Sequence, residues 1–400
     1  MDARVYKILV LLIILLFSVG CSIAGKSGIA LPQIAVLDPS PTAAILPSAA
    51  AVEPTAAELQ SIKDTVATQP TETPTQTASP TSTITPTPTA TEAIVEVGRE
   101  ITIEYLQDLE IMGSEITFEE ELDPTFYYRQ YIVSYISEGS KIYGLLTIPA
   151  VDPPEGGFKA IVFNHGYIPP TAYRTTERYT AYVDYLSRYG FVVFKIDYRG
   201  HGESEGEASG SYFSPGYTID SIAALKSLQT LDIIDPQGIG MWGHSMAGNL
   251  VLRAMLIEPD IKAGVIWAGA VYSYEDLVSY GINDTTYRPP ETSDDQGSSS
   301  PRRRSRQIIE TYGMPDSRVE YWKAVSLTEN IEYLNHPIQL HHAEDDTVVN
   351  IGYSYDLAGA LQEAGKEYEF YSYEGGGHNL ISPYFDQAML RTVEFFRNNL

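Results

Sequence analysis

Ser245 and His378 are two residues whose type and setting could carry out nucleophilic chemistry. Ser245 lies in the segment IGMWGHSMAGN (239–249), in which an apolar run typical of a strand ends at the serine and a helical pattern begins. The segment matches the Gly-x-Ser-x-Gly pattern of a tight strand–turn–helix, apart from Ala247 at the last glycine position. Such a turn exposes the serine hydroxyl, and the N–H of Met246 at the start of the helix would point toward a developing oxyanion. Ser245 is therefore predicted to be a nucleophile if a base and an acid accompany it.

Candidates for the acid and the base follow at the ends of two later strand-like runs. The run PIQLHHAEDDTVV (337–349) contains three consecutive acidic residues, 344–346, and EGGGHN (374–379) places His378 on a glycine-rich turn. A histidine can remove the proton from a serine hydroxyl when a carboxylate orients the ring. The order serine, acid, histidine, with each residue after a strand, is the order expected of a hydrolase built on a parallel sheet.

The elements that would position these residues are indicated by alternating hydrophobic patterns between about residue 99 and residue 400. Short apolar runs predict strands, and the longer amphipathic runs between them predict helices. Two strands, 127–136 and 141–150, would form a hairpin. The alternation predicts one α/β domain with a mostly parallel central sheet and helices on both faces. The other predicted strands are 159–166, 191–200, 238–245, 262–270, 337–343 and 367–375, and the predicted helices are 176–190, 218–230, 246–258, 353–365 and 386–399.

An insertion at residues 272–325 interrupts this alternation and includes PPETSDDQGSSSPRRRSRQ (289–307). A segment inserted after a strand of such a sheet lies near the carboxyl ends of the strands, where loops carry function. We therefore predict a partly flexible cap. Its basic cluster is expected to be a solvated loop, with a clamp for a substrate carboxylate as the alternative; the cluster consists of Arg302, Arg303, Arg304 and Arg306.

Four motifs in order resemble the catalytic domain of the prolyl oligopeptidase (S9) type within the α/β-hydrolase superfamily: DYRGHGES, GHSMAG, HHAEDDTVV and YEGGGHN. The resemblance covers about residues 128–400 and implies the α/β-hydrolase fold and a serine-type peptidase. The acid motif of that family, His-Gly-x-x-Asp-x-x-Val, matches residues 342–349 and selects Asp346 as the acid. The turn after the strand at 159–166 corresponds to a turn that supplies the second oxyanion donor, which implies the N–H of Tyr167, or of Gly166.

This sequence departs from the family pattern in ways that leave the substrate open. Ala247 and Ala343 replace glycines, and upstream of the hydrolase pattern we expect only a tether and a short strand-like stretch instead of the β-propeller of the peptidases. The predicted function is therefore a peptidase of the prolyl oligopeptidase type that acts through an acyl-enzyme, with a carboxylesterase acting on small acyl esters as the alternative. A non-catalytic binding protein on the same scaffold is the third interpretation. It predicts that one of the three catalytic residues is lost, whereas the sequence contains all three.

The N-terminal segment predicts export and attachment to a membrane. A basic start is followed by an uncharged apolar run and by SVGC, which resembles the lipobox of bacterial lipoproteins. We predict a signal peptide over residues 1–21 with lipidation at Cys21, the single cysteine, and an uncleaved anchor helix as the alternative. Residues 22–98 are rich in threonine and proline and are predicted to be a disordered linker. The hydrolase domain would then lie on the extracytoplasmic face, held at the membrane.

The overall charge and the remaining histidines exclude some classes of function. The formal net charge is −26, which argues against a nucleic-acid partner because a surface that follows phosphates must be basic. No His-Glu-x-x-His motif or cysteine cluster occurs, so neither a metal nor a cofactor is predicted. His244 is expected to have a packing role beside the serine, and His341 and His342 are expected to orient the acid loop. The predicted partners are a small ester or peptide substrate and the membrane.

Overall fold

The described part of the chain is a single α/β domain. The computed structural model describes residues 97–283 and 301–400; the predicted signal peptide with Cys21, most of the predicted linker and part of the predicted cap lie outside these residues. Val97 and Gly98, which the prediction assigned to the linker, contact the domain through their carbonyl oxygens, which accept hydrogen bonds from the hydroxyls of Tyr312 and Tyr321. None of the described helices has the length and apolar character needed to cross a membrane.

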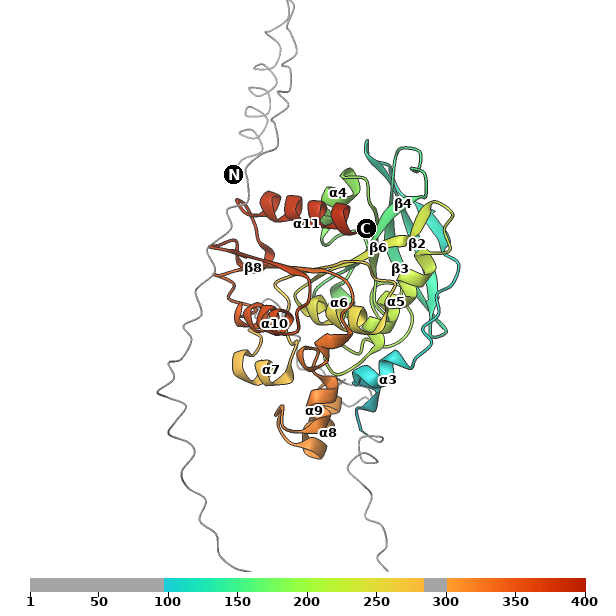
Figure 1. Cartoon of the computed structure of the whole chain (residues 1–400). Coiled ribbons are helices and arrows are strands. Elements are labelled where there is room, and N and C mark those ends of the chain that lie inside the picture. The colour runs from blue at the N-terminus through green and yellow to red at the C-terminus, as the bar shows by residue number, and fades with distance from the viewer. Residues whose placement is uncertain (1–96, 284–300) are drawn as a thin grey trace, which may run out of the picture. The chain divides into compact units, whose positions relative to one another are not determined.

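A sheet of nine strands runs through the described residues (Figure 1). The strands are β1 (Thr117–Glu121), β2 (Tyr128–Ser137), β3 (Ser140–Pro149), β4 (Phe158–Asn164), β5 (Val192–Ile196), β6 (Ile234–His244), β7 (Gly264–Trp267), β8 (Ile338–Ala343) and β9 (Tyr368–Tyr373). Their order is β1-β2-β3-β5-β4-β6-β7-β8-β9; β1, β2, β3 and β5 pair antiparallel, and the pairs from β5 to β9 are parallel. The prediction of a mostly parallel sheet is confirmed.

The hairpin of β2 and β3 forms as predicted. Ser137 pairs with Ser140, and both residues between them have positive φ, 47° at Glu138 and 81° at Gly139. A two-residue turn with positive φ at both positions matches the right-handed twist of the strands. The edge strand β1 lies upstream of this hairpin, where the sequence predicts a short strand-like stretch without defined bounds; its five residues, Thr-Phe-Glu-Glu-Glu, are all exposed.

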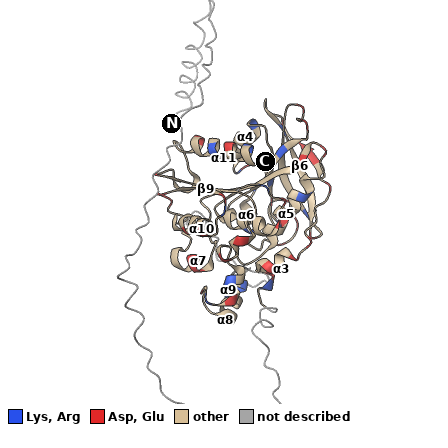
Figure 2. Cartoon of the chain, in the orientation of Figure 1, with Lys and Arg blue, Asp and Glu red and all other residues tan. Residues whose placement is uncertain are grey.

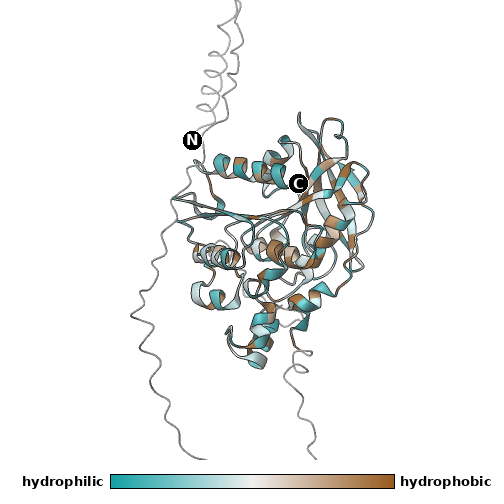
Figure 3. Ribbon diagram, viewed as in Figure 1, coloured by the Kyte–Doolittle hydropathy of each residue, from teal (hydrophilic) through white to brown (hydrophobic). Residues whose placement is uncertain are grey.

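Alternate residues of the central strands face two separate hydrophobic layers. In β4, Ala160 and Val162 belong to one cluster, and Ile161 and Phe163 belong to the other. A strand buried on both faces needs this continuous apolar run, which is why the sequence pattern identified it. Figure 3 shows the apolar residues concentrated along the sheet and the helix faces against it. The fold therefore places its core on both sides of the sheet.

Helices cover both faces of the sheet. The helices α4 (Thr180–Arg188) and α11 (Phe385–Asn399) contribute to one cluster, and α5 (Gly216–Leu228), α6 (Met246–Ile257) and α10 (Gly352–Glu363) contribute to the other (Figure 1). The helix predicted from residue 176 begins at Thr180 instead. Its N-cap, Tyr179, has φ 61° and ψ 18°, a left-handed conformation that cannot belong to the helix.

The predicted cap contains three described helices, α7 (Tyr274–Tyr280), α8 (Pro301–Tyr312) and α9 (Glu320–Val325). The helix α8 packs toward the start of the domain, where Arg304 forms an ion pair with Glu100 at 2.7 Å and Ile308 is fully buried. Figure 2 shows basic and acidic residues together around α8 and the short helix α3 (Ile103–Gln107). The described part of the insertion thus joins the N-terminal segment to the domain.

Candidate active site

Ser245 occupies the sharp turn between β6 and α6. Its backbone has φ 57° and ψ −121°, a region that residues other than glycine rarely adopt and that is found at functional sites. The turn is held because the Ser245 N–H donates to the Trp267 carbonyl at 2.9 Å and the Ser245 carbonyl accepts from Gly248 at 2.9 Å. A Cβ at Gly243 would lie 2.7 Å from the Ala247 carbonyl oxygen, so this position requires glycine. Ala247 itself is fully buried, and the turn accommodates its methyl group.

Asp346 lies in the loop after β8 and is fully enclosed by hydrogen-bond donors. Its Oδ1 accepts from the N–H groups of Val348 at 2.8 Å and Val349 at 3.0 Å. Its Oδ2 lies 2.7 Å from Nδ1 of His378 and 3.2 Å from Nε2 of His342. Burial raises the pKa of this carboxyl, but the hydrogen bonds from the two histidines outweigh burial and hold the pKa well below its usual range. Asp346 is therefore a carboxylate.

His342 supports this carboxylate from the end of β8. Its Nε2 also lies 3.0 Å from the Val349 carbonyl, and its Nδ1 lies 2.7 Å from the Ser354 hydroxyl. Two oxygen acceptors at Nε2 require the N–H there. His342 thus donates to the acid loop. His341, on the opposite face of β8, bonds Tyr373 and Gln339 and makes no bond to the acid loop within the described residues, so only one of the two histidines has the predicted position.

His378 lies on a short 3₁₀ turn, Gly377–Asn379, after β9. The glycines before it have positive φ, 108° at Gly376 and 59° at Gly377, which lets the chain reverse sharply. Asp345 fixes this turn, because its Oδ1 accepts from the Gly377 N–H at 2.7 Å. The two adjacent aspartates therefore have different partners: Asp346 orients the imidazole and Asp345 holds the backbone that carries it.

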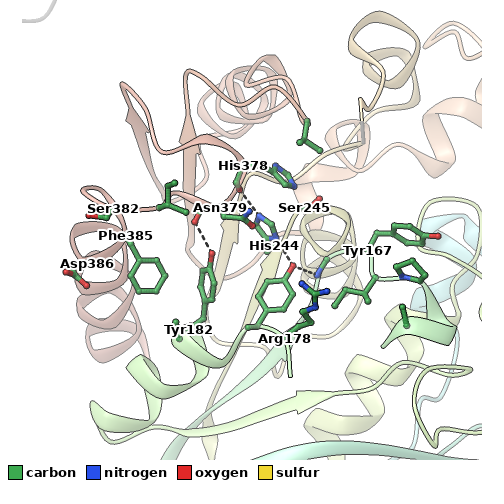
Figure 4. Close-up of a pocket in the computed structure, with 18 of the residues that line it drawn as sticks. Tyr167, Arg178, Tyr182, His244, Ser245, His378, Asn379, Ser382, Phe385 and Asp386 are labelled. Carbon is green, nitrogen blue, oxygen red and sulfur yellow. Dashed lines mark hydrogen bonds between the residues drawn. The ribbon is translucent and has the colours of Figure 1, made fainter. Parts of the chain in front are cut away.

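The two predicted reacting groups, Ser245 and His378, line one cavity of about 790 Å³. Figure 4 shows the His378 ring next to Ser245, with Tyr182 and Phe385 on one side and Tyr167 on the other. Within the described residues the Ser245 hydroxyl makes no hydrogen bond. Bonds between a nucleophile and its base are commonly long before a substrate binds, and tighten in the complex. None of the described residues of the predicted cap lines this cavity.

The backbone groups predicted to stabilise an oxyanion lie on either side of Ser245. Met246 is the first residue of α6, where N–H groups have no acceptor within the helix and the helix dipole favours negative charge. On the other side, the turn after β4 carries Gly166 and Tyr167, both of which line the cavity. The Gly166 N–H donates to the Tyr179 hydroxyl at 2.9 Å. Of the two alternatives for the second donor, the Gly166 N–H is therefore already bound by Tyr179.

A chain of hydrogen bonds joins the three loops of the site through His244. The Tyr179 hydroxyl, which accepts from Gly166, lies 2.7 Å from Nδ1 of His244, and Nε2 of His244 lies 2.8 Å from the His378 carbonyl oxygen. The carbonyl requires an N–H at Nε2, so Tyr179 donates to Nδ1. Burial, together with the nearby His378, lowers the pKa of His244 to about 3, so the ring is neutral. His244 has more than the expected packing role, because it supports the His378 backbone.

The motif at 197–204 supports the turn after β4. The Tyr198 hydroxyl donates to the His165 carbonyl at 3.0 Å, and Nε2 of His201 lies 3.2 Å from the Ile168 carbonyl. Arg199 anchors the motif to α5 through Asp220, with Nη2 and Oδ1 2.7 Å apart. Both flanks of the turn that carries Gly166 and Tyr167 are therefore fixed to one loop. In the part of the chain that the structure describes, no three His, Cys, Asp or Glu residues are arranged to hold a metal ion.

The fold and the strained serine turn at the carboxyl edge of the parallel strands are those of an α/β-hydrolase. The profile of the prolyl oligopeptidase family, peptidase S9, matches residues 177–400, and the chain belongs to this family. It is accordingly a serine hydrolase of the peptidase or esterase kind. The resemblance, the fold class and the enzyme class predicted from the sequence are confirmed.

Individual relatives are distant in sequence. The chain is 25% identical to the uncharacterized peptidase YtmA of Bacillus subtilis (strain 168) over 259 residues, which are 64% of this chain and 88% of that protein. Acetyl xylan esterase 1 from Thermoanaerobacterium sp. JW/SL YS485 has a TM-score of 0.53 at 16% identity, over 75% of this chain and 94% of the esterase. Dipeptidyl peptidase 4 of Porphyromonas gingivalis has a TM-score of 0.50 at 18% identity, over 68% of this chain and 36% of the peptidase. The two solved structures show the shared fold.

Proposed function

We propose that Ser245, His378 and Asp346 hydrolyse peptide or ester bonds through an acyl-enzyme. The observation that carries the proposal is the 2.7 Å bond from His378 to a buried carboxylate, beside a serine with φ 57° in the same cavity. The Ser245 oxygen attacks the acyl carbon while His378 takes the hydroxyl proton at Nε2, because Nδ1 already donates to Asp346. The imidazolium then gives this proton to the leaving amine or alcohol, whose bond to the acyl carbon breaks.

The second half of the reaction uses the same groups. Water enters, His378 takes one of its protons, and the remaining hydroxide attacks the acyl carbon of the ester formed with Ser245. The proton returns to the serine oxygen as the acid product leaves. In both steps, the N–H groups of Met246 and Tyr167 stabilise the negative charge on the carbonyl oxygen. Asp346 stays ionised throughout and stabilises the positive charge on the imidazole.

The substrate bond that we propose is an amide, in a peptidase of the prolyl oligopeptidase type. Family membership and the peptidase name of the Bacillus subtilis relative support this choice. A carboxylesterase is the second candidate, because the cavity is bounded by the hydrolase domain alone within the described residues. The test is a panel of aminoacyl and Xaa-Pro amides against short-chain acyl esters, with the Ser245→Ala variant as the blank. Amide turnover that requires Ser245 supports the peptidase, whereas ester turnover without amide turnover overturns it.

We also propose that the enzyme is held on the extracytoplasmic face of a membrane by a lipid on Cys21. The supporting feature is the sequence of residues 1–21, with a basic start, a short apolar run and the lipobox-like SVGC. The threonine- and proline-rich residues that follow would act as a tether between the membrane and the domain.

A further inference from the structure

Arg178 is the one lysine or arginine among the described residues that line the cavity of Ser245. Its side chain is exposed, and in the described part of the chain its guanidinium forms no hydrogen bond or ion pair. Figure 4 shows this side chain in the cavity, between Tyr182 and Tyr167 in that view and below Ser245. A cation with all its donors available therefore lies beside the groups that would act on a substrate.

The position of Arg178 is not one that helix stability explains. The residue lies two positions before the start of α4, where the helix dipole disfavours a positive charge. The next residue, Tyr179, has a left-handed backbone, which costs free energy and is retained mainly where function needs it. From the core side, the buried Lys195 donates from Nζ to the Arg178 carbonyl at 2.9 Å. The backbone that carries the guanidinium is thus held in place.

Neighbouring acids do not neutralise this cation through an ion pair. Glu177 precedes it, and Asp386 lines the same cavity, but neither forms an ion pair with Arg178 within the described residues. Figure 4 places Asp386 on the far side of Tyr182 and Phe385 from Arg178. Asp386 lies in the first turn of α11, where a carboxylate stabilises a helix. The acid thus has a structural explanation, whereas the arginine has none.

We propose that Arg178 binds a carboxylate of the substrate, so that the enzyme acts on esters or amides that carry an acidic group close to the scissile bond. The inference rests on the proposed function, since it assigns the substrate class of that same site. A guanidinium matches a carboxylate with two parallel N–H···O bonds, which gives direction as well as affinity. The rings of Tyr182 and Phe385 supply an apolar wall for the part of the substrate between its two polar groups.

The test compares substrates that differ only in the charge of one group. The first pair is mono-4-nitrophenyl adipate, which has a free carboxylate, and methyl 4-nitrophenyl adipate, in which that carboxylate is a methyl ester. In this pair the charge changes on the acyl group. The second pair is 4-acetoxybenzoate and its methyl ester. In this pair the charge changes on the leaving group. In at least one pair, Arg178→Ala should lower kcat/KM for the acid about tenfold or more relative to the methyl ester, the size of one charge-assisted hydrogen bond. Arg178→Lys keeps the positive charge but loses the two parallel N–H donors of the guanidinium, so it should recover part of the preference for the acid over the methyl ester.

The matched control is Arg174→Ala, which removes the same charge four residues away. Arg174 bonds the carbonyls of Thr171 and Tyr173 and does not line the cavity, so this variant should leave the acid-to-ester ratio unchanged. An equal effect of Arg174→Ala would show general charge attraction and overturn the assignment to Arg178. A ratio that Arg178→Ala leaves unchanged in both pairs would also overturn it.

A binding measurement separates this inference from the proposed catalysis. In the Ser245→Ala background, calorimetry with monomethyl adipate and dimethyl adipate should show tighter binding of the acid, and Arg178→Ala should remove that difference. Equal binding of the two compounds would overturn the inference whether or not the wild type hydrolyses esters. If the wild type hydrolyses no substrate but the binding preference depends on Arg178, the proposed function fails and the carboxylate site stands.

Discussion

Replacing Tyr179 with phenylalanine tests the chain of hydrogen bonds that joins the loops of the site. The substitution removes one oxygen and keeps the ring. That oxygen accepts from the Gly166 N–H at 2.9 Å and donates to Nδ1 of His244 at 2.7 Å, and both partners are buried. A buried polar group left without its partner costs about 1–3 kcal/mol, so two such groups lower the free energy of unfolding by about 2–6 kcal/mol. Urea unfolding followed by fluorescence measures this change.

The same variant should lower kcat more than it raises KM. Gly166 directly precedes Tyr167, and a turn that has lost its bond to Tyr179 no longer fixes the proposed oxyanion donor. Loss of one such donor lowers kcat by about 10²–10³-fold, which sets the upper limit of the expected effect. The control is Tyr182→Phe, which loses a single exposed bond to the Asn379 carbonyl and should cost about 0.5–1.5 kcal/mol. Equal stability of the two variants, with kcat unchanged in Tyr179→Phe, would refute the reasoning.

Four further predictions concern the serine turn, the acid, His244 and Cys21. Gly243→Ala places a Cβ 2.7 Å from the Ala247 carbonyl oxygen and should lower the free energy of unfolding by about 1–3 kcal/mol in thermal or urea unfolding, whereas an unchanged midpoint would contradict the tight turn. Asp346→Asn presents an amide to Nδ1 of His378 and should lower kcat by about 10⁴-fold in an ester assay, with a loss below tenfold as the contrary result. His244 is neutral when folded, with a pKa of about 3, while the unfolded chain takes up a proton near pH 6.5, so the free energy of unfolding falls as the pH falls between these values. Urea unfolding gives the free energy of unfolding at pH 7 and at pH 5, and its decrease between these two values should be about 2 kcal/mol larger in the wild type than in His244→Gln. Equal decreases in the two proteins would exclude a buried neutral ring at His244. Cys21→Ala should move the protein from the membrane fraction to the soluble fraction in cell fractionation, and an unchanged distribution would indicate a retained anchor helix instead.

The parts of the molecule that were predictable from the sequence are those with local patterns. Buried strands such as β4 show continuous apolar runs, and the serine turn shows small residues at fixed positions around Ser245. Order along the chain indicated His378 and the acidic residues 344–346, because both follow strands of one parallel sheet, and the resemblance to the acid motif of the family selected Asp346. The structure brings His378 to 2.7 Å from Asp346 and places it in the cavity of Ser245, and the catalytic roles of these residues are the proposal that the experiments test.

The parts that were not predictable depend on contacts between distant segments. A tyrosine with positive φ has no sequence signature, so the start of α4 and the role of Tyr179 could not be anticipated. His244 contacts the His378 backbone, and His342, though not His341, contacts Asp346, which only the folded chain decides. The contact between Asp345 and the turn that carries His378 did have a signal in the sequence. A glycine-rich turn at 374–379 needs an acceptor for its N–H groups, and the acidic residues 344–346 offer one in Asp345. Arg178 carries no signal in the sequence, because a single exposed arginine is common in a helical pattern.

The most direct test of the central claim is covalent labelling of the wild-type protein with a fluorophosphonate, followed by mass spectrometry of the modified peptide. The proposed mechanism predicts one adduct, on Ser245, formed at a rate that falls in Asp346→Asn and His378→Ala, and no adduct in Ser245→Ala. Labelling that persists in Ser245→Ala, or an adduct on another residue of the wild type, would contradict the assignment of Ser245 as the nucleophile.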